Sequence, residues 1–284
     1  MTISVQSIIE RVQATLQDTT GLRWPVVAEL ELWINDAQRE VSLIKPDATA
    51  KNESIALVAG TKQTIPANGN RLLNVIRNMS SAATDATGGR AIRAVDRETL
   101  DSQTPDWHNP NVTGYAAHTG VVKHFMYDDS NPRNFYVYPG VDPSAYIEIV
   151  YSANPEAVAT SSGVTAWTNG ATFAADAFVV KDSVKYQSQQ GSNTGVDPAT
   201  DTDNSHWLKV AITNLAVPDI FANAIMNYVL YMAYTKESEF AANAQRASTH
   251  YGLFTNALVG KAAVDQATQP IPPATVRSVQ QGVA

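Results

Sequence analysis

The 284-residue chain contains no cysteine. Disulfide bonds, thiolate catalysis and cysteine-based zinc sites are therefore excluded. Charged residues make up 17% of the sequence, which is below the roughly 25% of an average soluble protein. Isolated charges are costly to desolvate, so a surface poor in charge and rich in Asn, Gln, Ser and Thr suits burial against other subunits.

Positive charge is scarce and scattered along the chain. Twenty Lys and Arg residues stand against 27 Asp and Glu, for a net charge of −7 and a pI near 5.2. The absence of any basic run argues against a nucleic-acid clamp. No apolar run approaches the ~18 residues of a membrane helix, and Met1-Thr2-Ile3-Ser4 lacks the order of a signal peptide. We therefore expect a soluble protein that assembles in a cytoplasm-like setting.

The common catalytic and metal-binding motifs are also missing. HExxH, GxSxG and Walker A sequences do not occur, and no two histidines are four residues apart. The five isolated histidines, each expected to be structural, are His108, His118, His124, His206 and His250. We predict that the protein is not an enzyme and has no catalytic residues, cofactor or metal. A carboxylate pair of a glycoside hydrolase stays open, because such partners need only be close in space.

One acidic cluster deserves comparison with a calcium loop. Asp197, Asp201 and Asp203 lie close together in the sequence. They lack the ligand spacing, the central glycine and the distal glutamate of an EF-hand. A solvated loop is therefore favoured over a calcium site.

Four amphipathic helices are predicted, at residues 4–20, 25–45, 216–235 and 238–259. Ser4 can cap the first, Pro25 fits the first turn of the second, and Gly260 is expected to end the fourth. The fourth has the clearest pattern, with apolar residues spaced four, three, four, three and four apart. This heptad-like stripe is Phe240, Ala244, Ala247, Tyr251, Phe254 and Leu258.

Between the helices, residues 54–151 alternate with the period of strands. Phe135-Tyr136-Val137-Tyr138 and Ile147-Glu148-Ile149 show the alternation best, and Asn68-Gly69 and Pro139-Gly140 supply turns. The expected strands, which should pair antiparallel, are 55–59, 72–78, 91–95, 121–127, 135–138 and 146–151.

The composition changes again at residues 158–210, which are rich in Ser, Thr, Asn, Asp and Gly with isolated aromatics. We interpret this stretch as a small all-β module inserted into an adaptor-like core of residues 1–157 and 211–260. The predicted fold class is α+β: a bundle of about four helices, an antiparallel β extension and the inserted module. Residues 261–284 cannot form a core and are expected to be an extended C-terminal arm, or simply a frayed end.

Short segments from both sides of the module carry a family resemblance. They are Arg23-Trp24-Pro25, Leu57-Val58-Ala59-Gly60, Val95-Asp96-Arg97-Glu98-Thr99-Leu100, Phe135-Tyr136-Val137-Tyr138-Pro139, Tyr234-Thr235-Lys236-Glu237, Arg246-Ala247 and His250-Tyr251. In this order they resemble the head-to-tail adaptor, or connector, proteins of tailed bacteriophages, especially of short-tailed ones.

The resemblance implies a structural virion protein at the head–tail junction. Subunits would form a ring, typically a dodecamer, that joins the portal to the tail and continues the channel through which DNA passes without specific binding. The implied partners are further copies of the chain, the portal protein, and tail nozzle or tail fibre proteins, with no membrane involved. The C-terminal arm would contact the portal through Pro270, Ile271, Pro272, Pro273, Val276 and Arg277.

The predicted module is similar to small carbohydrate-binding modules of the chitin-binding type, through aromatics at Trp167, Phe173, Tyr186 and Trp207. Trp167, Tyr186 and Trp207 are candidates for stacking on sugar rings. A module of ~50 residues also needs its few large apolar groups inside, so a core role is favoured for them. The alternative function is a glycan-binding tail or surface protein. A tail-associated hydrolase is a third possibility, for which no residues stand out.

Overall fold

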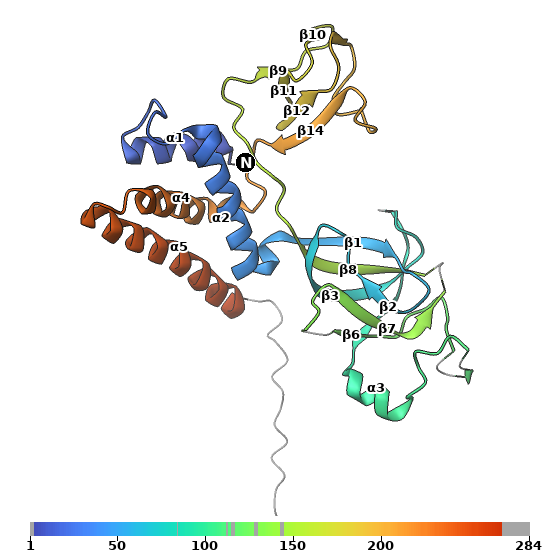
Figure 1. Ribbon diagram of the computed structural model, residues 1–284. Coiled ribbons are helices and arrows are strands. Elements are labelled where there is room, and N and C mark those ends of the chain that lie inside the picture. The colour runs from blue at the N-terminus through green and yellow to red at the C-terminus, as the bar shows by residue number, and fades with distance from the viewer. Residues whose placement is uncertain are drawn as a thin grey trace, which may run out of the picture. The chain divides into compact units, whose positions relative to one another are not determined.

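The computed structural model describes residues 3–83, 85–111, 113–114, 117–127, 130–142 and 145–268 (Figure 1). The chain divides into two compact units. We call Met1–Ala37 with Val158–Ala284 the helical unit, and Gln38–Ala157 the β unit. Helices and mostly antiparallel sheets occur together, which confirms the α+β class.

The helices lie in the order expected from the sequence, with different ends. They are α1 (Val5–Leu16), the π-helix η1 (Val26–Leu30), α2 (Glu31–Ile44), the 3-10 helix η4 (Asp219–Phe221), α4 (Ala222–Lys236) and α5 (Ala241–Thr268). The Ser4 hydroxyl accepts a hydrogen bond from the Ser7 amide at 3.2 Å and caps α1. Gln17, in the left-handed region at φ 57°, follows the last residue of α1, Leu16, so the helix ends before the predicted residue 20.

Helix α5 continues through Gly260, where the sequence predicts its end, to Thr268. A single glycine inside a helix costs only about 1 kcal/mol relative to alanine, and the helix-compatible sequence Lys261-Ala262-Ala263 follows it. Residues 261–268, assigned to the predicted arm, are therefore helical. The portal-contact positions Pro270, Ile271, Pro272, Pro273, Val276 and Arg277 lie outside the described residues.

The heptad-like stripe of α5 is only half buried within the chain. Ala247, Phe254 and Leu258 are buried, and the Phe254 ring lies 5.1 Å from the ring of Tyr228 on α4. Phe240 and Tyr251, from the same stripe, are exposed. The periodicity thus identifies a helix with more apolar surface than α4 covers.

The predicted module has its own small sheet. Strands β9 (Thr165–Ala166), β11 (Phe178–Lys181), β12 (Val184–Ser188) and β14 (Trp207–Ile212) lie in the order β14-β12-β11-β9, and β10 (Thr172–Phe173) pairs with β13 (Asn193–Thr194). Val179, Tyr186 and Trp207 form its core.

Polar contacts join this module to the N-terminal helices. The Glu31 carboxylate accepts from the Thr160 amide at 2.8 Å, and the Asn35 side chain makes hydrogen bonds to both backbone groups of Val158. The module accordingly belongs to the same compact unit as the helices, and residues 38–157 form the other unit. The sequence pattern instead groups residues 1–157 with 211–260, because local periodicity carries no information on these long-range contacts.

The β unit contains two four-stranded sheets, with orders β1-β8-β3-β4 and β2-β7-β6-β5. The strands are β1 (Ala50–Ala56), β2 (Gly60–Thr64), β3 (Gly69–Met79), β4 (Gly88–Ala91), β5 (Arg93–Ala94), β6 (His124–Tyr127), β7 (Asn134–Val141) and β8 (Tyr146–Ala153). Alternate residues Phe135, Val137, Ile147 and Ile149 are fully buried in one core. The β5–β6 pair is parallel, unlike the other pairs of this unit.

Two elements of the β unit were not predicted. Helix α3 (Arg97–Gln103) is capped by Asp96, whose carboxylate accepts from the Glu98 amide at 3.2 Å. Its Leu100 packs with Trp107 and Met126 in a small second core. Strand β2 (Gly60–Thr64) has few apolar residues. The capping signal at Asp96 was present in the sequence, whereas β2 depends on its pairing with β7.

Candidate functional site

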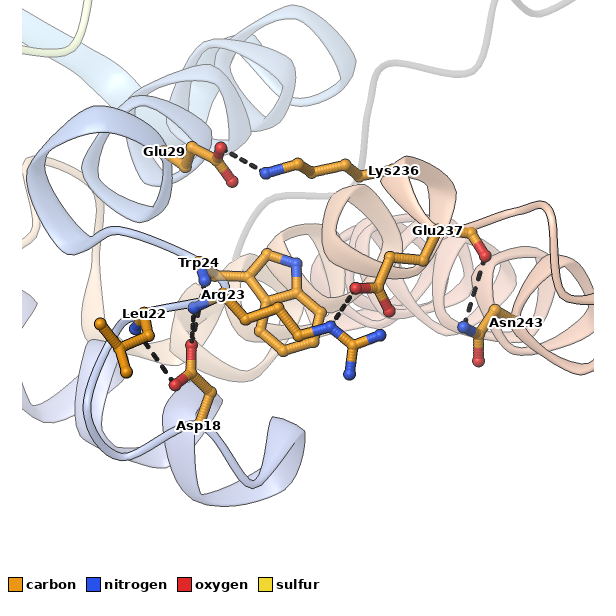
Figure 2. A network of polar contacts seen from close by, with 8 residues as sticks. All are labelled: Asp18, Leu22, Arg23, Trp24, Glu29, Lys236, Glu237 and Asn243. Carbon is orange, nitrogen blue, oxygen red and sulfur yellow. Dashed lines mark hydrogen bonds and ion pairs between the residues drawn. The ribbon is translucent and has the colours of Figure 1, made fainter.

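The loop that follows α1 is organised around one carboxylate. Asp18 accepts hydrogen bonds from the backbone amides of Leu22 at 3.3 Å, Arg23 at 2.9 Å and Trp24 at 3.0 Å. Figure 2 shows the side chain pointing into this loop. These bonds, the Trp24 amide foremost, lower the pKa of Asp18 because they favour its charged form. The loop therefore presents Arg23 and Trp24 in a defined conformation.

Two ion pairs tie this N-terminal region to the end of α4. The Arg23 guanidinium pairs with Glu237, and Lys236 pairs with Glu29 of η1 (Figure 2). The Arg23 guanidinium also lies 4.7 Å from the Trp24 ring centre. The Trp24 ring is only 3% exposed, and its Nε1 has no hydrogen-bond partner among the described residues. Partly exposed ion pairs contribute little stability, so their main effect is to orient the side chains.

These side chains border a polar cavity of about 560 Å³ in the helical unit. It is lined by Thr15, Leu16, Gln17, Arg23, Trp24, Tyr234, Glu237, Asn243, Arg246 and His250. The His250 ring stacks on Tyr234 with centroids 5.6 Å apart, and the Arg246 guanidinium lies 5.7 Å from the same Tyr234 ring. Burial lowers the pKa of His250, and its Nδ1 is 2.9 Å from Asn227 Oδ1.

The cavity brings together three segments that are distant in sequence. Arg23-Trp24, Tyr234 with Glu237, and Arg246 with His250 are parts of the segments that carry the family resemblance. The amino-acid pattern alone did not indicate that they meet. The fold thus collects ionic, aromatic and amide groups from three separate segments around one cavity.

Two of the histidines and two of the aspartates make local contacts within their own units. His108 Nδ1 is 2.7 Å from the Thr61 hydroxyl, and His206 Nδ1 is 2.8 Å from the Ser205 hydroxyl. Asp201 accepts from the Trp207 amide at 2.6 Å, while Asp197 pairs with Lys181. Across the described residues, no group of three or more His, Cys, Asp or Glu side chains is placed to hold a metal ion.

The candidate glycan-stacking rings lie largely inside the module. Trp207 is 1% exposed and donates a hydrogen bond from Nε1 to the Val196 carbonyl at 2.9 Å, and Tyr186 is 9% exposed. Trp167 is partly buried against the same core, with the Lys181 amine 4.4 Å from its ring centre. Sugar stacking needs an open ring face, which the two buried rings do not offer.

None of the helices in the described ranges combines the length and apolarity needed to span a bilayer. No curated protein matches the chain.

A protein-family model for the SU10 adaptor protein matches residues 3–182 and 193–277. The match spans both units and includes most of the predicted module, all but residues 183–192, so this module lies largely within the family's shared sequence. It also covers every segment of the cavity described above. The chain therefore belongs to the SU10 adaptor protein family and is a structural adaptor protein of the phage head–tail region.

Proposed function

We propose that the chain forms a ring that joins the portal to the tail of a short-tailed phage and continues the DNA channel. The observation that carries this proposal is the family match over most of the chain. The exposed apolar side chains of the helical unit support it. A monomer gains nothing from such side chains, whereas a ring buries them between neighbouring copies.

Two sets of exposed apolar residues would form the two sides of the contact between neighbouring subunits in the ring. Leu22, Val27 and Leu32 lie on the loop after α1, on η1 and on α2, with exposures of 86%, 65% and 57%. Phe240, Leu253 and Val259 lie before and on α5, with exposures of 65%, 49% and 62%. A heterologous interface joins one patch of a subunit to a different patch of the next, as a ring requires.

The C-terminal segment is proposed to reach the portal. The family match extends to residue 277, past the end of α5 at Thr268. The segment contains Gln269-Pro270-Ile271-Pro272-Pro273 and few charges, a composition that suits an extended peptide bound along a partner. Its proposed contacts are Pro270, Ile271, Pro272, Pro273, Val276 and Arg277.

The net charge of −7 suits a channel for DNA, because an acidic or neutral lumen does not retain phosphate groups. Tail nozzle or tail fibre proteins are the proposed partners on the far side of the ring. The six-residue apolar set and the arm serve different contacts, so they can be tested separately.

Electron microscopy of the chain mixed with its cognate portal tests the proposal. We expect rings stacked on the portal. Leu22→Glu and Leu253→Glu should each abolish rings while circular dichroism stays unchanged, and Leu208→Glu, a 40% exposed position on β14, is the matched control. Intact portals that recruit no chain would refute the adaptor role, and rings formed equally by all three variants would refute the assigned interface.

A truncation after Thr268 tests the arm. The cut leaves all of α5 in place. We expect ring formation to persist and portal docking to weaken by at least tenfold, on the order of 1.4 kcal/mol. Equal docking by the full and shortened chains would show that the arm does not contact the portal.

A further inference from the structure

A small basic pocket lies in the β unit, outside the cavity of the helical unit. It has a volume of about 240 Å³ and is lined by Arg90, Ala91, Arg93, Lys123 and His124. Arg90 comes from β4, Arg93 from β5, and Lys123 immediately precedes β6. Arg93 and His124 are directly paired across the parallel β5–β6 ladder, so their side chains share one face.

No ion pair within the described part of the chain neutralises the cations of this pocket. Among the described residues, no Asp or Glu forms an ion pair with Arg90, Arg93 or Lys123. The chain as a whole is acidic, with 27 acidic against 20 basic residues, so three unpaired cations at one place stand out. A cluster of positive charges usually attracts negatively charged side chains, and within the described residues no acidic side chain pairs with this cluster.

A buried asparagine holds the segments that carry these cations. Asn78, which is 7% exposed, donates from Nδ2 to the Arg90 carbonyl at 2.9 Å and to the Val122 carbonyl at 2.8 Å. Its Oδ1 accepts from the Val122 amide at 2.7 Å. The Arg93 amide further donates to the Lys123 carbonyl at 3.2 Å. The backbone of the pocket is therefore set before any ligand arrives, which lowers the entropy lost on binding.

His124 lines the pocket and lies among positively charged side chains. Burial lowers the pKa of His124, and the nearby Arg90, Arg93 and Lys123 lower it further. Its ring stacks on Tyr138, with centroids 6.2 Å apart, and its buried Nδ1 has no hydrogen-bond partner among the described residues. An anion in the pocket would offset this positive potential.

We propose that this pocket binds a carboxylate side chain on an acidic segment of a protein partner. Arginine and lysine side chains around a single small cavity match one anionic group in size and charge. Val121, two residues before Lys123, is 46% exposed, so an apolar side chain lies close in sequence to the pocket. The combination fits a peptide that carries an acidic residue next to an apolar one.

Nucleic acid fits these observations less well. Binding along a phosphate backbone depends on cations spread over a path of several phosphates, and the salt dependence reflects how many are neutralised. Here the unpaired cations converge on one cavity of about 240 Å³ in a chain of net charge −7. The pocket is also independent of the apolar residues assigned to the ring interface.

The test uses the full chain and a labelled, end-capped hexaglutamate peptide at low ionic strength, followed by fluorescence anisotropy. We expect Arg93→Gln combined with Lys123→Gln to weaken binding at least about tenfold, since two charge-assisted contacts are lost. Lys51→Gln combined with Lys62→Gln, at exposed positions on β1 and β2, removes the same charge elsewhere in the unit and should change affinity less than about twofold.

Three outcomes would overturn the proposal. The first is that the wild-type chain shows no measurable affinity for the peptide at low ionic strength. Both double variants can lose affinity equally, which would indicate diffuse charge. A single-stranded DNA hexamer can bind more tightly than the peptide and depend on Arg93 and Lys123, which would assign the pocket to nucleic acid. Ring formation, followed by microscopy, should be unchanged in both double variants, so failure here is distinguishable from failure of the adaptor role.

Discussion

The two units differ in where their large apolar side chains are buried and where they are exposed. The β unit has a main core of 15 buried residues, including Phe135, Val137 and Ile147, and the small second core around Trp107. The helical unit leaves large apolar side chains exposed on the loop after α1, just before α5 and on α5, namely Leu22, Phe240 and Val259. The β unit also exposes Leu43 and Val58, at 68% and 63%. The helical unit differs in that half of the apolar stripe of α5 is exposed while the other half is buried.

Charge pairing differs between the cavity of the helical unit and the basic pocket of the β unit. In the helical unit the conspicuous cations Arg23 and Lys236 are paired with Glu237 and Glu29. In the β unit Arg77 pairs with Glu148, whereas no ion pair within the described residues involves Arg93 or the other cations of the small pocket. The two sites therefore differ in how far the chain itself satisfies their charges.

The largest expected effect on stability distinguishes a buried from an exposed apolar position of a single helix. Leu258→Ala, at a fully buried position of α5, should lower the free energy of unfolding by about 2–5 kcal/mol, because it removes packing and leaves a cavity. Leu253→Ala, 49% exposed on the same helix, should change it by less than about 0.5 kcal/mol in the unassembled chain. Urea denaturation at low protein concentration measures both. Equal losses would mean that Leu253 is already packed within one subunit.

A smaller effect is expected at the asparagine that supports the basic pocket. Asn78→Ala removes three hydrogen bonds and leaves buried backbone groups of Arg90 and Val122 without partners, so we expect a loss of roughly 2–3 kcal/mol. Asn52→Ala, at an exposed position on β1, should stay within about 0.5 kcal/mol. Thermal unfolding compares the two. A loss at position 78 no larger than that at position 52 would contradict a supporting role.

The smallest effect concerns acid sensitivity of the loop after α1. Hydrogen bonds lower the pKa of Asp18 in the folded chain, so its stabilising contribution is present above the unfolded value near 4 and is lost as pH falls below it. Asp18→Asn keeps a capping side chain but removes the titration. The wild type should therefore lose stability more steeply than the variant below about pH 4. Parallel acid-denaturation profiles would show that Asp18 does not contribute.

Local pattern was enough to predict several elements and not others. The period of Val5, Ile8, Ile9 and Val12 predicts α1, and all four residues are buried. Strand β2 was missed because Gly60–Thr64 is mostly polar and is held by pairing with β7. The end of α5 was misplaced because Gly260 was treated as a stop signal, although the neighbouring sequence supports a helix.

The candidate site was predictable only in part. Residues such as Trp24 and Glu237 were noticed because they belong to segments that resemble adaptor proteins, and nothing in their spacing showed that they line one cavity. The basic pocket was missed altogether. Arg90, Arg93 and Lys123 are separated in sequence and do not form a basic run, so a search for clustered charge does not detect them.

The sequence by itself determined the α+β class, the order of the main helices and the adaptor family, because these depend on hydrophobic period and on ordered short segments. Only the tertiary structure decided which half of the α5 stripe is buried, which aromatic rings form the core of the β module, and which cations converge on one pocket. The reason is physical. The hydrophobic period shows that one face of an element is apolar, and the residue type shows that a side chain is charged. Whether that face is buried or that charge is paired depends on which other residues the folded chain places next to it.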